Sequence, residues 1–292
     1  MIHSGEGIFE GEGGQVLRWQ TWAPEEPRAR VILVHGLGEH SGRYAFVAGA
    51  LAGRGFAVFT YDQRGHGRSA GTRGHADAFD NLVEDLRLAM HEARIRLPGE
   101  LSEAIVAHSM GGLVTLKYLQ SVDEEPPAAV VISAPWLKTK RHISGWLLRL
   151  AEFLDGIWPS APLGRSVDPS MLTRDPVMIE AYRADRYVHG RLSPRLFFEV
   201  ERAQEEVLAD GCGFPFPTLF LVPGGDPIVD PETTIAFARG FDGDVDVHEL
   251  PGLRHEPFNE VEREEVLGTV GDWLSRQLPR TGLGDAGSSP PE

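Results

Sequence analysis

Apolar runs of strand length recur along the chain, bounded by glycine, proline or polar residues. Five of them lie at Arg30–Gly36, Phe56–Asp62, Glu103–Ser109, Ala128–Pro135 and Pro217–Gly225. Such runs are typical of strands that are buried on both faces of a sheet. A sixth segment, Asp244–Gly252, alternates valine with polar residues and predicts a strand with one polar side. Near the N-terminus, Ile8–Glu10 and Val16–Thr21 predict a short hairpin.

Helical patterns separate these strands. The expected helices cover Tyr44–Arg54, Phe79–Arg96, Met110–Ser121 and Asn259–Gln277. Asn259 and Glu262 have the spacing of a capping pair, which predicts that the last helix starts at Asn259. Because buried strands alternate with helices, the sequence predicts an α/β protein whose mostly parallel central sheet is flanked by helices on both faces.

Residues 135–215 interrupt this alternation with amphipathic helical patterns and proline-rich joints. The segment is too long for a simple connection in a compact domain. It therefore predicts a helical cap inserted between the first part of the core, 1–134, and the second part, 216–278. The tail, 279–292, is rich in Gly, Ser and Pro, which predicts disorder.

The predicted cap contains an apolar helical stripe next to a basic segment. The stripe consists of Ile143, Trp146, Leu147, Leu150 and Leu154. The basic residues are Lys138, Lys140, Arg141 and Arg149. Packing onto the core would explain the stripe, and so would an acyl-chain tunnel or a lid that touches a membrane. A basic amphipathic helix suits a lipid surface, so transient membrane-surface contact through the cap is a hypothesis.

Composition narrows the classes of partner and compartment. The net charge of −15 argues against nucleic-acid binding, which requires a basic surface. The single cysteine, Cys212, excludes an internal disulfide. The N-terminal segment lacks the basic and apolar parts of a signal peptide, and no apolar run is long enough to span a bilayer. We therefore expect a cytoplasmic protein, peripheral at membranes if the cap touches them.

Ser109 lies between a buried strand and a helical run, as a nucleophile on a strand-to-helix turn would. The motif G-x-S-x-G reads A-H-S-M-G here, with Ala107 in place of the first glycine. Alanine is the next smallest residue, so the tight turn is still expected. The alternative is a serine that only caps the following helix.

A serine nucleophile needs a base and an acid that orients the base. His255 follows the last predicted strand in a loop, whereas His248 lies within that strand on its polar side. Asp226 follows the preceding strand directly. Asp230 has another function, because it precedes a proline at the start of a helical run. The sequence thus favours Ser109, Asp226 and His255 as a catalytic triad.

Two backbone N–H groups must bind the oxyanion of the reaction. Met110, directly after the serine, and Leu37, in the Gly-rich loop after an early strand, are the expected donors. A phosphate site is not favoured, because the loop lacks a dinucleotide fingerprint or a Walker lysine. His35 and His40 do not have the spacing of a zinc site, so no metal ligand is predicted.

Five segments resemble the monoacylglycerol lipase and lysophospholipase group of α/β-hydrolases, in the same order. They are His35–Tyr44, Asp62–Ser69, His108–Gly112, Gly224–Asp230 and His255–Glu260, within a similarity that covers about 8–277. The resemblance implies an α/β-hydrolase fold and the triad and oxyanion residues already chosen. It also implies that Glu39 and Arg43 shape the polar end that holds the alcohol, and that Tyr182 makes a polar contact there. The chain departs from the group at Ala107 and Leu37.

The expected function is hydrolysis of monoacylglycerol to fatty acid and glycerol through an acyl-enzyme, without a metal or organic cofactor. A lysophospholipase, a general carboxylesterase or a peptidase could use the same triad. A non-catalytic binding protein that retains the fold is a further alternative, which the candidate triad argues against.

Overall fold

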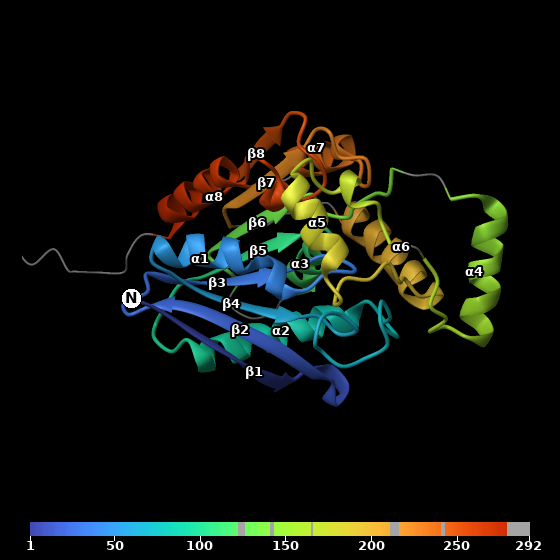
Figure 1. Cartoon of the computed structure of the whole chain (residues 1–292), viewed down its shortest axis with the longest axis horizontal. Helices are drawn as coiled ribbons and strands as arrows, with labels where there is room; N and C mark the ends of the chain where they lie inside the picture. The colour runs from blue at the N-terminus through green and yellow to red at the C-terminus, as the bar shows by residue number, and fades with distance from the viewer. Residues whose placement is uncertain (122–125, 141–142, 165, 211–215, 241–242, 279–292) are drawn as a thin grey trace, which may run out of the picture.

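The computed structural model describes residues 1–121, 126–140, 143–164, 166–210, 216–240 and 243–278. Its centre is an eight-stranded sheet in the order β1-β2-β4-β3-β5-β6-β7-β8 (Figure 1). The strands are β1 (Ile2–Glu10), β2 (Val16–Pro24), β3 (Ala29–Val34), β4 (Phe56–Asp62), β5 (Glu103–His108), β6 (Ala129–Ser133), β7 (Thr218–Pro223) and β8 (Val245–Leu250). The six strands β3 to β8 run parallel to one another, while β1 and β2 form an antiparallel hairpin at one edge. The predicted α/β class is confirmed, and the hairpin is longer than predicted.

Alternate residues of the buried strands enter two separate cores. Ile32 and Val34 of β3 join the core on one face of the sheet, and Val31 and Leu33 join the other. The first core is covered by α2 (Asp80–Arg96), α3 (Met110–Ser121), α6 (Pro194–Ala209) and α7 (Pro231–Arg239). The second is covered by α1 (Ala45–Gly53) and α8 (Arg263–Gln277). Continuous apolar runs are needed because both faces of these strands are buried.

The start of the last helix differs from the prediction. Helix α8 begins at Arg263, and Asn259 instead ends the 3₁₀ turn η4 (Pro257–Asn259). The Asn259 side-chain amide donates to Glu256 Oε2 over 2.9 Å, a contact across this turn. Glu262 precedes α8 and makes no side-chain cap hydrogen bond. The capping prediction was wrong because the chain forms a 3₁₀ turn that ends at Asn259, and the helix begins only at Arg263.

The segment between β6 and β7 contains α4 (Gly145–Ile157), α5 (Pro176–Ala184) and α6. Helix α6 packs on the core, while α4 lies beyond it at the end of the molecule (Figure 1). In α4 only Ala151 is buried, and Asp155 pairs with Arg195 of α6 at 2.7 Å. The predicted apolar stripe does not pack inward: Trp146 and Leu150 are exposed.

The end of the inserted segment is hydrogen-bonded to loops of the sheet region. His189 N donates to Gly38 O over 2.8 Å, and Ser193 N donates to Gly74 O over 2.9 Å. Gly38 has a φ of +77°, and a Cβ there would lie 2.3 Å from His189 O. Only glycine therefore allows this close approach. The loop after β3 and the inserted segment are in direct backbone contact.

Candidate active site

Ser109 occupies the single residue between β5 and α3. Its φ of +53° is in the left-handed region, which a non-glycine residue rarely adopts. The turn brings the start of α3 against β3, and a Cβ on Gly111 would lie 2.5 Å from His35 O. Ala107 is buried in β5 between Val34 of β3 and Ile132 of β6. The structure accommodates its methyl group, so Ala107 does not prevent the tight turn.

Ser109, His255 and Asp226 form a continuous hydrogen-bonded chain. His255 Nε2 lies 3.0 Å from Ser109 Oγ, and His255 Nδ1 lies 2.7 Å from Asp226 Oδ2. The other carboxylate oxygen of Asp226 accepts from the backbone N–H of Ile228 (2.7 Å) and Val229 (3.1 Å). Both carboxylate oxygens are therefore held by hydrogen bonds, and Asp226 in turn orients the imidazole. The geometry suits proton transfer from a serine hydroxyl.

The rejected candidates lie elsewhere. Asp230 accepts a hydrogen bond from the Thr233 hydroxyl (2.7 Å) and directly precedes α7. His248 is exposed on β8. Chain order and strand position were therefore sufficient to distinguish these residues from the three that come together.

The two histidines at the site have opposite pKa shifts. Burial alone would lower the pKa of His255, but the Asp226 carboxylate, together with Glu256 and Glu39, outweighs this effect and the pKa is raised. Burial, with the nearby His255, lowers the pKa of His108 to about 4. The two rings lie 4.9 Å apart, and His108 Nδ1 has no hydrogen-bond partner among the described residues. His108 is thus neutral at pH 7, and His255 is the titrating base.

The expected oxyanion donors lie on both sides of Ser109. Met110 is the first residue of α3, where N–H groups have no acceptor within the helix. Leu37 belongs to the loop after β3 and lines the same cavity as Ser109. Glu39 holds this loop, because its Oε1 accepts from Gly36 N and from the Tyr44 hydroxyl, each at 2.7 Å.

A buried cluster of charged residues lies beside the triad. Arg43 Nη1 donates to Glu39 Oε2 (2.7 Å) and to Glu256 Oε1 (2.8 Å), and Nη2 donates to Glu256 Oε2 (2.6 Å). Burial would raise the pKa of Glu39, but Arg43 lowers it to about 2. The Tyr182 ring covers Arg43 with its centroid 5.0 Å away, and burial raises the tyrosine pKa to about 12. Glu39, Arg43 and Tyr182 thus lie together beside the triad.

Sequence reasoning missed Glu256 as a member of this cluster. Its only signal was an acidic residue directly after the candidate base. Its partner Arg43 is 213 residues away along the chain, so no local pattern connects them.

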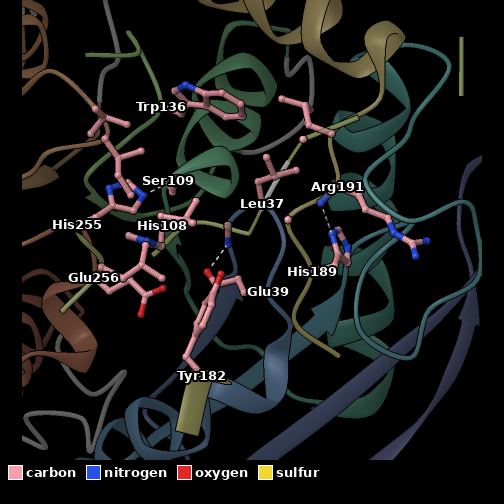
Figure 2. Close-up of a pocket in the computed structure, with 18 residues that line it drawn as sticks. Leu37, Glu39, His108, Ser109, Trp136, Tyr182, His189, Arg191, His255 and Glu256 are labelled. Carbon is pink, nitrogen blue, oxygen red and sulfur yellow. Dashed lines mark hydrogen bonds between the residues drawn. The ribbon is translucent and has the colours of Figure 1, made fainter. Parts of the chain in front are cut away.

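Ser109 opens into a cavity of about 230 Å³ (Figure 2). Its apolar lining comprises Leu37, Trp136, Val167, Leu172, Leu192, Ile228 and Val229. Glu39, Tyr182 and Glu256 provide polar atoms and lie on the side of Ser109 away from Trp136 (Figure 2). A cavity with one apolar end, one polar end and a nucleophile between them can hold a small amphiphilic ester.

Among the described residues, neither a cluster of metal ligands nor a helix suited to span a membrane occurs. In the part of the chain that the structure describes, no group of three or more His, Cys, Asp or Glu side chains could hold a metal ion. None of the helices within those ranges is both long enough and apolar enough to cross a bilayer.

Comparison with known proteins identifies similar hydrolases. A family profile described as "Serine aminopeptidase, S33" matches residues 25–262. The monoacylglycerol lipase of Mycolicibacterium smegmatis is 32% identical over 276 residues, which cover 94% of this chain and 98% of that protein. An uncharacterized abhydrolase domain-containing protein of Dictyostelium discoideum is 30% identical over 90% of this chain, which spans only 28% of that protein's length. The crystal structure of a Paleococcus ferrophilus monoacylglycerol lipase has a TM-score of 0.78 and 28% identity, covering 95% of this chain and 99% of that chain.

Proposed function

This chain belongs to the serine aminopeptidase S33 family. Within that family, we propose that it is a monoacylglycerol lipase with Ser109 as the nucleophile. It is a serine hydrolase with a lipase or esterase function. The observation that carries the proposal is the hydrogen-bonded chain from Asp226 through His255 to Ser109. The amphiphilic cavity and the similarity to monoacylglycerol lipases support the choice of substrate.

In the proposed mechanism, His255 Nε2 removes the Ser109 proton while Oγ attacks the ester carbonyl carbon. The backbone N–H groups of Leu37 and Met110 bind the oxyanion of the tetrahedral intermediate. Protonated His255, stabilised by Asp226, gives its proton to the departing alcohol oxygen. Water, deprotonated by the same histidine, then hydrolyses the acyl-enzyme and releases the fatty acid.

The two ends of the cavity would hold the two parts of the substrate. The acyl chain would lie along the apolar residues, among them Leu37 and Trp136. The glycerol would lie against Glu39 and Tyr182, which Arg43 holds in place. Residues 135–215 would act as the cap over this cavity, because Val167, Tyr182 and Leu192 line it from that segment.

A lysophospholipase is the second candidate. A Bacillus subtilis relative named Phospholipase YtpA is 28% identical over 249 residues, which cover 85% of this chain and 95% of that protein. The same triad would serve either substrate, so head-group selection has to distinguish them.

Transient membrane contact through α4 is part of the proposal. Trp146, Phe153 and Ile157 are 69%, 64% and 65% exposed. Lys138 Nζ lies 3.4 Å from Asp230 Oδ2, and Lys140 Nζ donates to Asp226 O over 3.3 Å. These two lysines therefore contact the sheet region. The exposed apolar side chains of α4 support membrane contact better than the lysines do. Arg141 lies outside the described residues.

The enzymatic proposal is tested by labelling with a fluorophosphonate probe and by hydrolysis of matched lipid esters. The native protein should be labelled, and Ser109→Ala should abolish labelling. This variant should also reduce monoacylglycerol hydrolysis by at least about a thousandfold. Substrates are monoacylglycerol, diacylglycerol, lysophosphatidylcholine and p-nitrophenyl esters over several chain lengths. Absence of labelling, or a strong preference for the lysophospholipid, would contradict the proposal.

A further inference from the structure

The polar end of the cavity contains two carboxylates for one guanidinium. The side chains of Glu39, Arg43 and Glu256 are only 4%, 7% and 6% exposed. The pKa of Glu39 is about 2 and that of Arg43 is well above its usual value, so both groups are charged at pH 7. With Glu256 as a carboxylate that binds the guanidinium through both oxygens, the cluster carries one net negative charge.

The carboxylates face the substrate, whereas the cation does not. Glu39 and Glu256 line the cavity, but Arg43 is not among its lining residues. Arg43 donates to both carboxylates, and the ring of Tyr182 covers it. An incoming head group therefore meets carboxylate oxygens, with the guanidinium behind them.

Among the described residues that line the cavity, no other permanent cation is directed at this end, and His255 is neutral in the form that acts as the base. His108 is neutral at pH 7, because its pKa is about 4. Tyr182 is neutral as well, with a pKa of about 12. Arg191 lines the cavity, but its side chain points away from Glu39 and Glu256 (Figure 2). The third carboxylate of the site, Asp226, adds further negative charge.

We propose that this end of the cavity discriminates alcohols by charge: it accepts uncharged hydroxylated or cationic alcohols and rejects anionic ones such as glycerol phosphates, with Glu256 as the specificity-determining residue. Carboxylate oxygens accept hydrogen bonds from hydroxyl groups, while ionised phosphate oxygens only accept. Two negative groups brought together in a water-poor site repel strongly. The inference rests on the proposed ester hydrolase function and specifies its leaving group.

The effects of substituting Glu256 and Glu39 can be distinguished, because the two side chains make different further contacts. Glu39 also holds Gly36 N in the oxyanion loop, so its loss should lower the turnover of every substrate. Besides Arg43, the Asn259 side chain donates to the Glu256 carboxylate. Glu256→Gln therefore removes one charge near the leaving alcohol without removing an acceptor from the oxyanion loop.

The test compares three soluble esters with the same acyl group: glycerol monobutyrate, its glycerol 3-phosphate counterpart and butyrylcholine. The native enzyme should cleave the phosphate ester with the lowest kcat/KM. Glu256→Gln should raise the anionic-to-neutral ratio of kcat/KM roughly tenfold and lower the cationic-to-neutral ratio. A purely structural role would change all three in the same direction, which would overturn the inference.

Two further variants complete the design. Glu180→Gln removes a 70% exposed carboxylate from α5 and should leave both ratios unchanged. Glu39→Gln should shift both ratios in the same direction as Glu256→Gln, with a lower kcat for all three esters. If Glu256→Gln does not fold, Glu39→Gln takes its place in the test. If the native enzyme cleaves the phosphate and glycerol esters equally well, the charge inference fails while the proposed function stands. If it labels with fluorophosphonate but does not cleave the glycerol ester, the proposed substrate fails, and the inference with it.

Discussion

At the scale of single residues, the backbone of Ser109 and the pKa of His255 determine the proposed chemistry. The strained backbone of Ser109 presents Oγ to His255, and Asp226 raises the pKa of that histidine against the effect of burial. The proposed reaction needs neutral His255 as a base. Its rate should therefore depend on pH through this one side chain.

We expect kcat/KM to fall as the pH drops through the pKa of His255. Because that pKa is raised, the acid limb should lie above pH 6.5, the usual value for histidine. In Asp226→Asn the raising charge is lost and burial dominates, so the limb should move to lower pH, while kcat falls by roughly 10⁴-fold. The pH–rate profile of a soluble butyrate ester gives both values. An unshifted limb in the variant would mean that another group titrates.

The same shift has a consequence for stability. A histidine whose pKa is raised in the folded state binds its proton more tightly there than in the unfolded chain. His255 therefore contributes stability that is fully present below its unfolded pKa and is lost as the pH rises through the folded value.

The sequence predicted the site residues whose position follows from the order of strands. Ser109 and Asp226 each follow a buried strand, and His255 follows the half-exposed strand β8, so parallel strands had to bring them to one end of the sheet. Glu256 could not be assigned in this way. Its function depends on a contact with Arg43 that only the complete fold creates.

At the scale of elements, apolar periodicity identified the strands correctly but not the environment of α4. A stripe on a helix indicates that one face is apolar, and it does not indicate what covers that face. In the structure Trp146 and Leu150 are exposed, while Ala151 is buried. The predicted start of α8 was wrong because residues 257–259 form a 3₁₀ turn, which the spacing of Asn259 and Glu262 does not reveal.

If α4 contacts membranes, its large exposed side chains should determine the affinity. Replacing Trp146 and Phe153 with serine should weaken binding to neutral phosphatidylcholine vesicles at least about tenfold, because both side chains would lose apolar burial. Vesicle sedimentation measures the partition coefficient. Hydrolysis of glycerol monobutyrate should be unaffected.

Ile8→Ser, on β1 and 61% exposed, is a matched control that should bind as the native protein does. Equal binding by the double variant would exclude α4 as the contact.

At the scale of the whole molecule, segments far apart in the chain are joined at the edge opposite the active site. Arg28, just before β3, donates to Ser275 O (3.0 Å) and Leu278 O (2.8 Å) at the end of α8. The last carbonyl groups of a helix have no partner within it, and a cation there also complements the helix dipole. This contact joins the start of the parallel sheet to the last described helix.

Arg28→Ala should lower the free energy of unfolding by about 1–3 kcal/mol, because charge-assisted hydrogen bonds to partly buried carbonyl groups are lost. Urea unfolding followed by circular dichroism measures the change. The activity of the folded variant should remain, since Arg28 lies at the end of β3 remote from Ser109. Arg239→Ala, at the exposed end of α7, should change the stability by less than about 0.5 kcal/mol. An equal effect of both variants would refute the specific role of Arg28.

The backbone contact between Gly38 and His189 also limits how such enzymes can be recombined. A Cβ at position 38 would collide with the carbonyl of residue 189, so this core glycine is matched to the path of the inserted segment. Exchange of residues 135–215 between relatives would preserve the oxyanion loop only if the new segment followed the same path past it. Within this family, chimeras should be active when the inserted segment is exchanged together with the loop that contains this glycine. Chimeras in which the segment is exchanged alone, and follows another path, should not be active.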